Sequence, residues 1–500
     1  LNNEKYSKLF KLSDINFAGV TDLEQKTIII NFSKVLNSIN CRFSYTVADE
    51  YVDESAFSKR ILYKKRGDDM DMLCDAFNEV INEKVTDAKQ GLYQTIYLTL
   101  TVEAKNIREA KNALASVEAT LSSTLIQIGI NGMAGSSLEP VSLNERMQIW
   151  YNFTHTGLHT NYKFDWQSCM KQNKDWIDIV SPESLVFYND YFILNGNRYG
   201  RVMYISRHAQ SLESDTLSEL AKINSTNYVT VNSELLDLSG YKQEIIRKHS
   251  SVGFQIEKEK KRNRDNNDFL ADASDKLLTE KDSLIKLSRQ VETGDDHFFN
   301  TTVLIAFLAK SYEEMVDITD QIEAIGGVKS FDVKKCFDKQ REGLNSTFMF
   351  GVQEFKRMTN FSAPCQAMYM PFKTQELNDP DGTFYGINKL SQNPIIANRK
   401  LLDSFHGMIL GKTRYGKSLF AKCEIISNRC LHPEDQTLII DPQNEYKGIA
   451  HAPGVNGTVV SFDTQKEVYV NPMDVNFEDV DYATLQEIIS ELSLIHISEP

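Results

Sequence analysis

The chain has 500 residues, 41% of them hydrophobic, and a formal net charge of −14. This length and apolar content are enough for about three domains with proper cores. The acidic balance argues against a globally basic nucleic-acid binder, while local basic patches remain open. Seven scattered cysteines without a Cys-x-x-Cys pair favour a reducing cytosol over a disulfide scaffold. No apolar run approaches the roughly 18 residues that cross a bilayer, so any membrane association is expected to be peripheral.

The N-terminal part, residues 1–140, is predicted to be a mixed α/β subdomain. Gln94–Val102 alternates β-branched and aromatic residues, which predicts a strand. A helix is expected from Asn106 onward, because Asn106 and Glu109 have the spacing of a capping box. The apolar face of this helix is predicted to consist of Ala110, Leu114, Val117 and Leu121.

A second strand and helix repeat this pattern later in the chain. Thr301–Phe307 predicts a strand, and Ser311 with Glu314 predicts the cap of the next helix. Ala309-Lys310 also repeats Ala104-Lys105. The helix stripe would consist of Met315, Ile318, Ile322 and Ile325. The similarity indicates a duplicated strand–helix unit, although amphipathic βα pieces look alike and chance explains the pattern nearly as well.

The middle of the chain, residues 141–390, is predicted to form a second α/β part. Ser142 and Glu145 form another capping box, which opens a short helix. Asn195-Gly196 predicts the turn of a hairpin within Val186–Tyr204, because both residue types tolerate positive φ angles.

Two features of this middle part raise alternatives. His155 and His159 are four residues apart, which suggests a metal pair, but no third ligand is nearby and a loop or core role is expected. Residues 241–292 are polar, charged and predicted to be helical, and both signs mix within Lys258–Arg262. A solvated helical hairpin is expected for this segment, and a basic arm for DNA or anionic lipid is the alternative.

The sequence Gly411-Lys-Thr-Arg-Tyr-Gly-Lys-Ser418 fits the phosphate-binding pattern Gly-x-x-x-x-Gly-Lys-[Ser/Thr]. In this pattern, backbone N–H groups wrap the nucleotide phosphates, the lysine reaches the β and γ oxygens, and the serine hydroxyl meets Mg²⁺. We therefore expect ATP and Mg²⁺ as cofactors, Lys417 as a catalytic residue and Ser418 as a metal ligand. The predicted nucleotide-binding residues are Gly411, Lys412, Thr413, Arg414, Tyr415, Gly416, Lys417, Ser418 and Leu419.

Apolar runs on both sides of this loop predict a βαβ unit. Phe405–Leu410 is expected to be a buried strand before the loop, and Lys417–Arg429 a helix after it. Thr437–Ile440 predicts a second buried strand, which ends on Asp441. This order would aim the N-terminal amides of the helix at the phosphates and place Asp441 where parallel strands present acids to a ligand. Asp441 is therefore a candidate metal ligand.

Further motifs surround the loop and carry a family resemblance. They are Arg341–Asn345, Met370–Leu377, Gly382–Asn388 and Asn393–Arg399 before it, and Asp441–Tyr446 and Asn471–Asp474 after it. On these segments the chain resembles the VirB-four class of conjugative type IV secretion ATPases, in the form found in Gram-positive conjugative elements. The resemblance extends from roughly residue 12 to residue 492 and is strongest from residue 340 onward.

This resemblance implies a cytoplasmic protein attached peripherally to the inner face of the membrane, where it would contact type IV secretion channel proteins. Family members form homo-oligomers, often described as hexamers, and hydrolyse ATP to drive channel assembly or DNA transfer. Their C-terminal part is a RecA-like motor related to the FtsK and HerA pumps, so residues 391–500 are expected to begin such a P-loop ATPase domain. Carried over by residue, Asp441 and Glu445 fall on the family's Asp-Pro-x-x-Glu-Tyr motif near the nucleotide, which makes Glu445 a further catalytic candidate.

The chain departs from the family pattern in two places. The family usually has glycine and a small residue at the positions of Arg414 and Tyr415, so Arg414 is expected to stiffen the loop. Its guanidinium either contacts the phosphates or faces solvent. The family's Walker B strand lies far downstream of Asp441, and Leu494–Pro500 resembles a translated sequencing-adaptor tail. We therefore expect an incomplete motor domain, with native sequence ending near Leu492, so that the complete protein hydrolyses ATP and this chain at most binds it.

Two other functions remain open at this point. A HerA- or FtsK-like DNA translocase or coupling protein would act directly on DNA, and salt-dependent DNA binding with stimulated turnover would favour it. Such proteins usually bring transmembrane segments or a different N-terminal module, and neither is visible in this sequence. A scaffold whose nucleotide site only reports a bound state would bind ATP without turning it over.

Overall fold

The computed structural model describes residues 4–51, 61–89, 92–130, 135–156, 162–172, 175–209, 211–223, 225–265, 274–294, 296–374, 376–389, 391, 393–402, 404–412 and 414–460. The chain divides into two compact units. The first, called here the sheet unit, consists of residues 1–65 and 74–408. The second, called the C-terminal unit, consists of residues 66–73 and 409–500.

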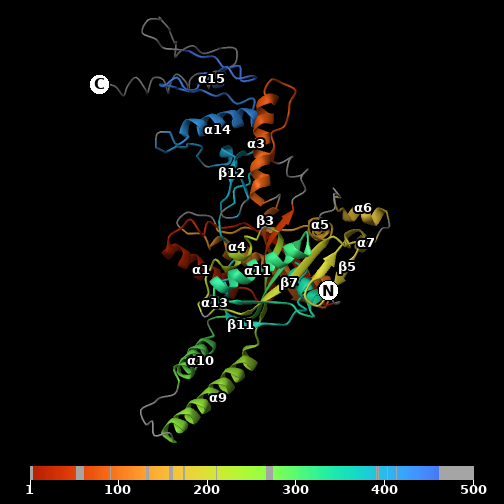
Figure 1. The fold of residues 1–500 in the computed structure, drawn as a ribbon, viewed down its shortest axis with the longest axis vertical. Coiled ribbons are helices and arrows are strands. Elements are labelled where there is room, and N and C mark those ends of the chain that lie inside the picture. Colours follow the sequence, from red (N-terminus) through yellow and green to blue (C-terminus); the bar gives the residue numbers. More distant parts are fainter. Residues whose placement is uncertain are drawn as a thin grey trace, which may run out of the picture. The chain divides into compact units, whose positions relative to one another are not determined.

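An 11-stranded sheet organises the sheet unit (Figure 1). Its strand order is β4-β1-β3-β2-β8-β9-β7-β6-β5, and β10 pairs with β7 while β11 pairs with β9. The pairings are antiparallel. The strands are β1 (Lys5–Leu12), β2 (Arg42–Tyr51), β3 (Leu92–Glu103), β4 (Leu138–Pro140), β5 (Leu185–Phe187), β6 (Phe192–Leu194), β7 (Arg198–Arg207), β8 (Thr226–Leu235), β9 (Phe298–Ala309), β10 (Asp332–Lys335) and β11 (Thr359–Ser362). The predicted strands Gln94–Val102 and Thr301–Phe307 are confirmed as parts of β3 and β9, and the mixed α/β character is confirmed with a mostly antiparallel sheet.

The sheet consists of two halves with the same internal order. In chain order the first half is β1, β2, β3 and β4, and these lie in the order β4-β1-β3-β2. The second half repeats this arrangement as β10-β7-β9-β8. Both have the fourth-first-third-second order of a split β-α-β fold. The halves join where β2 pairs with β8, near Thr46 and Thr230, whose hydroxyl oxygens are 2.9 Å apart and hydrogen-bonded. The two similar strand–helix units predicted from the sequence thus occupy equivalent places, and the structural repeat extends to four strands in each half.

The helices that follow the two third strands begin with the predicted caps. In α4 (Ile107–Ile126), the Asn106 side chain accepts a hydrogen bond from the Glu109 N–H at 2.9 Å. In α11 (Tyr312–Val328), the Ser311 hydroxyl accepts one from the Glu314 N–H at 3.1 Å. Helix α4 buries its whole predicted stripe, while α11 buries Met315, Ile318 and Ile322 and leaves Ile325 half-buried against the same core. Equivalent caps therefore start equivalent helices in the two halves.

Helices cover both faces of this sheet. One face packs against α1 (Asp22–Asn37), α4, α8 (Thr216–Leu220), α11 and α13 (Ala363–Ala367). The other face packs against α5 (Leu143–Thr154) and α12 (Gln340–Thr347). Alternate residues of β9 serve the two cores, since Ile305 lies in the first and Ala306 in the second. The remaining helices here are α3 (Asp71–Lys89), which begins in the C-terminal unit, α6 (Trp166–Lys171) and α7 (Trp176–Val180).

The polar segment 241–292 forms the predicted helical hairpin. Its helices are α9 (Leu238–Asp265) and α10 (Asp275–Thr293), inserted between β8 and β9 (Figure 1). Tyr241 and Ile245 of α9 pack with Val291 of α10 against Phe298 of β9. Farther along, Val252 and Ile256 pack on leucines of α10. Within the described ranges, none of the helices combines the length and apolar composition that a membrane crossing requires.

Smaller predictions for the middle of the chain have clear outcomes. Ser142 caps α5 by accepting the Glu145 N–H at 3.2 Å. Asn195 and Gly196, with φ angles of 50° and 69°, form the predicted turn between β6 and β7. His155 ends α5 and stacks on the Tyr151 ring at 3.9 Å, in agreement with a packing role. His159 lies outside the described residues.

A two-stranded ribbon ends the sheet unit. Its strands are β12 (Thr383–Ile387) and β13 (Pro394–Ala397), followed by the short 3₁₀ helix η1 (Arg399–Leu401). The buried Asn393 side chain accepts the Gln94 N–H at 2.9 Å and donates to the Gln94 C=O at 3.1 Å. This amide therefore binds the backbone of β3 as a neighbouring strand would.

Candidate nucleotide-binding site

Helix α14 (Lys417–Leu431) begins directly after the predicted phosphate loop, and it confirms the helix expected over Lys417–Arg429. Gly416 precedes it with a φ angle of 84°, the left-handed region that glycine adopts without strain. No side chain caps this helix start, and the first hydrogen bond that enters it runs from the Phe420 N–H to the Gly416 C=O at 2.9 Å. The N–H groups of Lys417, Ser418 and Leu419 consequently lack intrahelical partners, and the positive end of the helix dipole suits an anion there.

Lys417 lies across the beginning of the loop. Its Nζ donates a hydrogen bond to the Lys412 C=O at 3.3 Å, and the Tyr415 N–H points to the same carbonyl at 3.3 Å. A Cβ added at Gly411 would lie 3.2 Å from the Cγ of Lys417. Glycine at the first motif position therefore leaves room for the lysine stem. Lys412, Arg414 and Lys417 together give the loop three positive charges.

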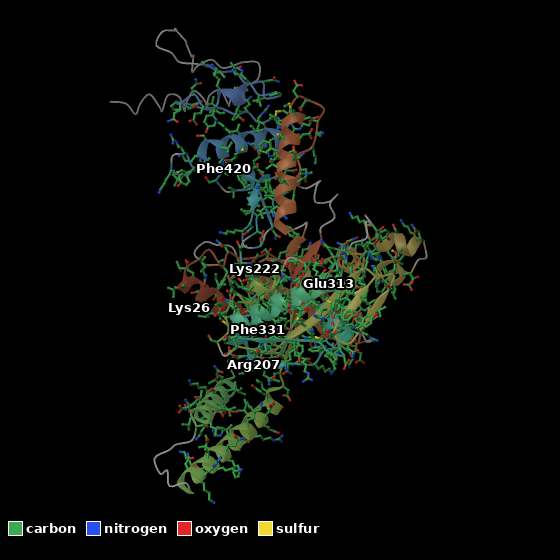
Figure 2. The ribbon with its side chains drawn as sticks, in the orientation of Figure 1. Lys26, Arg207, Lys222, Glu313, Phe331 and Phe420 are labelled. Atoms are coloured by element: carbon green, nitrogen blue, oxygen red, sulfur yellow. The ribbon has the colours of Figure 1, made fainter. Side chains whose placement is uncertain are left out.

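The two positions that depart from the family pattern are exposed. Arg414 has a φ angle of 69°, an unusual conformation for a residue with a Cβ atom. The Tyr415 side chain is 79% exposed. Leu419 and Phe420, which follow on α14, are also largely exposed, and Phe420 is labelled in Figure 2. Thr413 lies outside the described residues, so eight of the nine predicted loop residues have a defined place.

Asp441 organises a turn of its own. One carboxylate oxygen, Oδ1, accepts the Gln443 N–H at 3.2 Å, and Oδ2 accepts the Tyr446 N–H at 2.8 Å. Asn444 lies in the left-handed region within this turn, and α15 (Lys447–Ala450) follows it. A carboxylate has about four lone-pair sites, so these two bonds leave capacity for a cation. The metal role of Asp441 and the catalytic role of the exposed Glu445 stay predictions.

A contact that the sequence did not predict joins this turn to α14. The Nζ of Lys422 lies 5.3 Å from the ring centroid of Tyr446, a cation–π distance. Lys422 follows Ser418 by four residues and thus lies on the same face of α14. The Asp441 turn is therefore attached along the Ser418 side of the helix. The four-residue spacing was a usable signal, but nothing local pointed to Tyr446 as the partner.

Basic side chains support the C-terminal end of α14. The Arg429 guanidinium donates to the Pro433 and Asp435 carbonyls, each at 2.6 Å. Arg66 donates to the Cys430 C=O from the separate segment of this unit. Positive charge at this end interacts favourably with the helix dipole and satisfies carbonyl groups at and beyond the last turn.

The two strands predicted around α14 are wrong for the described structure. Phe405–Leu410 and Thr437–Ile440 have no regular secondary structure and belong to no strand. Leu410 is 82% exposed and Leu438 is 92% exposed, whereas buried parallel strands need neighbours on both edges and cover on both faces. In the described part of the C-terminal unit, helices occur but no strand does. Apolar composition alone cannot supply those partners, and the parallel RecA-like sheet stays a prediction.

The loop fits a phosphate-bearing ligand with a magnesium ion better than a protein-built metal centre. Over the residues that are described, no group of three His, Cys, Asp or Glu side chains is placed to hold a metal. Mg²⁺ bound to nucleotides commonly uses one or two protein ligands, with phosphate oxygens and waters supplying the rest. The Ser418 hydroxyl at the start of α14 meets that requirement.

Comparison with known proteins bears on this part of the chain. No curated protein matches the sequence. Residues 398–490 match the family model described as "Helicase HerA, central domain". This domain is found in FtsK/HerA-like P-loop ATPases, including conjugation ATPases. The matched segment contains the loop Gly411–Ser418, α14 and the Asp441 turn, so this part of the chain is similar to the central domain of a HerA-type P-loop ATPase.

Proposed function

We propose that this chain is part of the ATP-binding motor subunit of a conjugative type IV secretion apparatus, which in its complete form hydrolyses ATP to energise channel assembly or substrate transfer. The observation that carries the proposal is the loop Gly411–Ser418, with Lys417 folded across it at the uncapped start of α14. The HerA-domain match over the same residues supports ATP as the ligand. The motif resemblance before and after the loop supports the conjugative setting.

Each residue of the loop has a stated role in this proposal. The N–H groups of Gly416–Leu419 surround the phosphates, and the Lys417 ammonium leaves the Lys412 carbonyl to bind the β and γ oxygens. Ser418 holds Mg²⁺, which when bound neutralises charge on the phosphates. Asp441 and Glu445 are the nearby acids, and the Lys422–Tyr446 contact keeps their turn against α14.

The cellular setting is part of the same proposal. The protein is cytoplasmic, lies peripherally at the inner face of the cell membrane, and contacts type IV secretion channel proteins. It works as a homo-oligomer, a hexamer by family resemblance, around a RecA-like motor domain. The motif resemblance described above supports each of these points.

The test is Lys417→Ala in the complete protein. Loss of one charge at the phosphates is expected to lower ATP turnover by a factor on the order of 10² to 10³. Lys447→Ala, at an exposed lysine of the same unit, serves as the matched control. If Lys417→Ala hydrolyses ATP as fast as Lys447→Ala, the proposed role of Lys417 at the phosphates is refuted.

A HerA- or FtsK-like translocase or coupling protein that acts directly on DNA is the second candidate, because the matched family model is itself that of a helicase domain. The two candidates differ in their response to DNA. A translocase would show turnover stimulated by double-stranded DNA, with binding that weakens steeply as salt rises. A secretion motor without direct DNA grip would show neither.

A further inference from the structure

The exposed edges of the large sheet are protected unequally. Unpaired N–H and C=O groups on an edge strand invite pairing with another chain, and proteins usually block them with charge or proline. Strand β10 carries Asp332, Lys334 and Lys335 and is protected by charge. Strands β4 and β5 form the two ends of the sheet, and they differ in how their edges are protected.

Strand β4 is blocked by a proline at an outward position. The Ser13 N–H binds the Ser137 C=O at 3.1 Å, and the Val141 N–H binds the Leu9 C=O at 2.9 Å. Because antiparallel strands alternate, residues 137, 139 and 141 bond to β1, while Leu138 and Pro140 direct their backbone outward. Pro140 has no N–H to offer, so this edge presents a single outward donor.

Strand β5 has neither charge nor proline, and its short length of three residues is its remaining protection. The Asn195 N–H binds the Ser184 C=O and the Tyr188 N–H binds the Tyr191 C=O, both at 2.8 Å. Residues 184, 186 and 188 therefore face β6, and Leu185 and Phe187 direct both their N–H and C=O groups outward. No charge and no proline occurs in Leu185–Phe187, and no strand among the described residues pairs with this side.

An aromatic surface lies beside this edge. Val186 and Tyr188 are 48% and 46% exposed. Tyr188 stacks on Tyr191 with their ring centroids 4.6 Å apart, and the Tyr191 ring packs edge-on against Tyr312 of α11 at a centroid distance of 5.7 Å. We call Val186, Tyr188, Tyr191, Tyr199 and Tyr312 the tyrosine surface.

Asp190, next to Tyr191 in the sequence, is already paired with positive charges. The Asp190 carboxylate lies 3.0 Å from the Arg201 guanidinium and 3.4 Å from the Lys335 ammonium. A surface rich in tyrosine has the composition of a protein–protein interface, whereas nucleic acid and lipid head groups are bound by clusters of positive charge.

We propose that β5 pairs with β5 of a second copy of this chain, antiparallel, about a twofold axis at Val186. In this register Leu185 of one copy lies opposite Phe187 of the other, so the outward groups of both residues meet their complements. The arrangement repeats itself under twofold rotation, as an isologous dimer requires. Leu185 and Phe187 keep their side chains on the core of their own copy, while the Val186 side chains meet across the axis. This contact does not depend on nucleotide chemistry.

The first test is the assembly state of the chain by sedimentation velocity over a range of concentrations. The wild type is expected to form dimers that dissociate on dilution. Val186→Lys puts two like charges directly opposite each other and is expected to weaken dimerisation at least about tenfold. Ile246→Lys, at a 61% exposed isoleucine of α9, is the matched control and should dimerise like the wild type. A wild type that stays monomeric, or a dimer that Val186→Lys leaves unchanged, overturns the proposal.

A second variant keeps the proposal testable if Val186→Lys fails to fold. Val186→Cys places two thiols opposite each other, at a Cβ separation of about 4.5–5.5 Å that a small shift closes to disulfide geometry. Mild oxidation should then give a covalent dimer joined through position 186 of both copies. The wild type, with its own seven cysteines, is the control. The twofold pairing is contradicted if the cross-links map only to other positions, or if the wild type forms covalent dimers at the same rate.

Discussion

Strand β9 and the stretch Thr437–Ile440 are both runs of apolar, partly β-branched residues, yet only the first is a strand. β9 lies between β8 on one side and β7 and β11 on the other, and Val303–Phe307 is fully buried. Thr437–Ile440 has no strand partner in the described residues, and Ile440 is 87% exposed. This difference shows that apolar composition favours burial of a segment, while the presence of neighbouring strands decides whether the segment becomes a buried strand.

The largest expected effect tests this difference directly. Ile305→Ala removes a fully buried side chain from β9 and is expected to lower the free energy of unfolding by about 2–5 kcal/mol. Ile440→Ala makes the same change at an exposed site and should alter stability by no more than about 0.5 kcal/mol. Urea denaturation of both variants measures this. Equal losses would mean that Thr437–Ile440 is buried in solution.

The dense packing of the sheet unit also has a pH signature. Burial raises the pKa of Glu50, the second-last residue of β2, to about 7, against the opposing influence of Lys11 and hydrogen bonds from Tyr228 and Tyr97. In the unfolded chain this carboxyl titrates near 4.5. Its raised pKa favours the folded state below pH 4.5, and this stabilisation is lost as the pH rises through 7.

Glu50→Gln removes that titration. It should flatten the pH dependence of stability between about pH 4.5 and 7 and make the variant more stable than the wild type at pH 8, by at most about 3 kcal/mol. Glu139→Gln, at an exposed position of β4, is the control. Denaturation series at pH 5 and pH 8 decide the matter, and a wild-type-like slope in Glu50→Gln would contradict it.

Smaller effects are expected in the C-terminal unit, whose loop is exposed. Arg414→Gly relieves a left-handed backbone conformation and should stabilise this unit by about 1 kcal/mol. Asn444→Gly, also at positive φ, should gain less because asparagine tolerates that region. Thermal unfolding measures both. If Arg414→Gly also leaves ATP affinity unchanged, the alternative in which its guanidinium contacts the phosphates fails.

The smallest effect concerns the contact between Lys422 and Tyr446. A cation–π pair at an exposed site contributes about 0.5–1 kcal/mol, so Tyr446→Leu should weaken Mg²⁺-ATP binding two- to fivefold. Tyr446→Phe retains the ring and should bind within about twofold of the wild type. Titration with a fluorescent ATP analogue, with and without Mg²⁺, compares the two. Equal behaviour of Leu and Phe at position 446 would show that the ring does not position the Asp441 turn.

Local signals predicted local structure well. The Asn106–Glu109 and Ser311–Glu314 spacings gave the starts of α4 and α11, because a cap is decided by residues three positions apart. The start of α14 after Gly416 was also predicted from a local signal, the glycine-rich motif with apolar residues at helical spacing behind it. The pairing of β2 with β8 had no local signature, since it joins residues far apart in sequence. The Lys422–Tyr446 contact and the missing partners of Phe405–Leu410 also depend on distant chain segments.

The helical hairpin between β8 and β9 has a consequence for how the sheet assembles. Closing a long connection normally costs chain entropy before the strands it joins can pair. Here α9 and α10 pack against each other along their length. Tyr241 near the start of α9 and Val291 near the end of α10 meet beside Phe298, the first residue of β9. At the same place the Leu236 N–H donates to the Phe298 C=O at 2.8 Å. Because helices form from local contacts, the hairpin brings the end of β8 to the start of β9 as a short turn would. We therefore expect β8 and β9 to pair early in folding, although many residues separate them in the sequence.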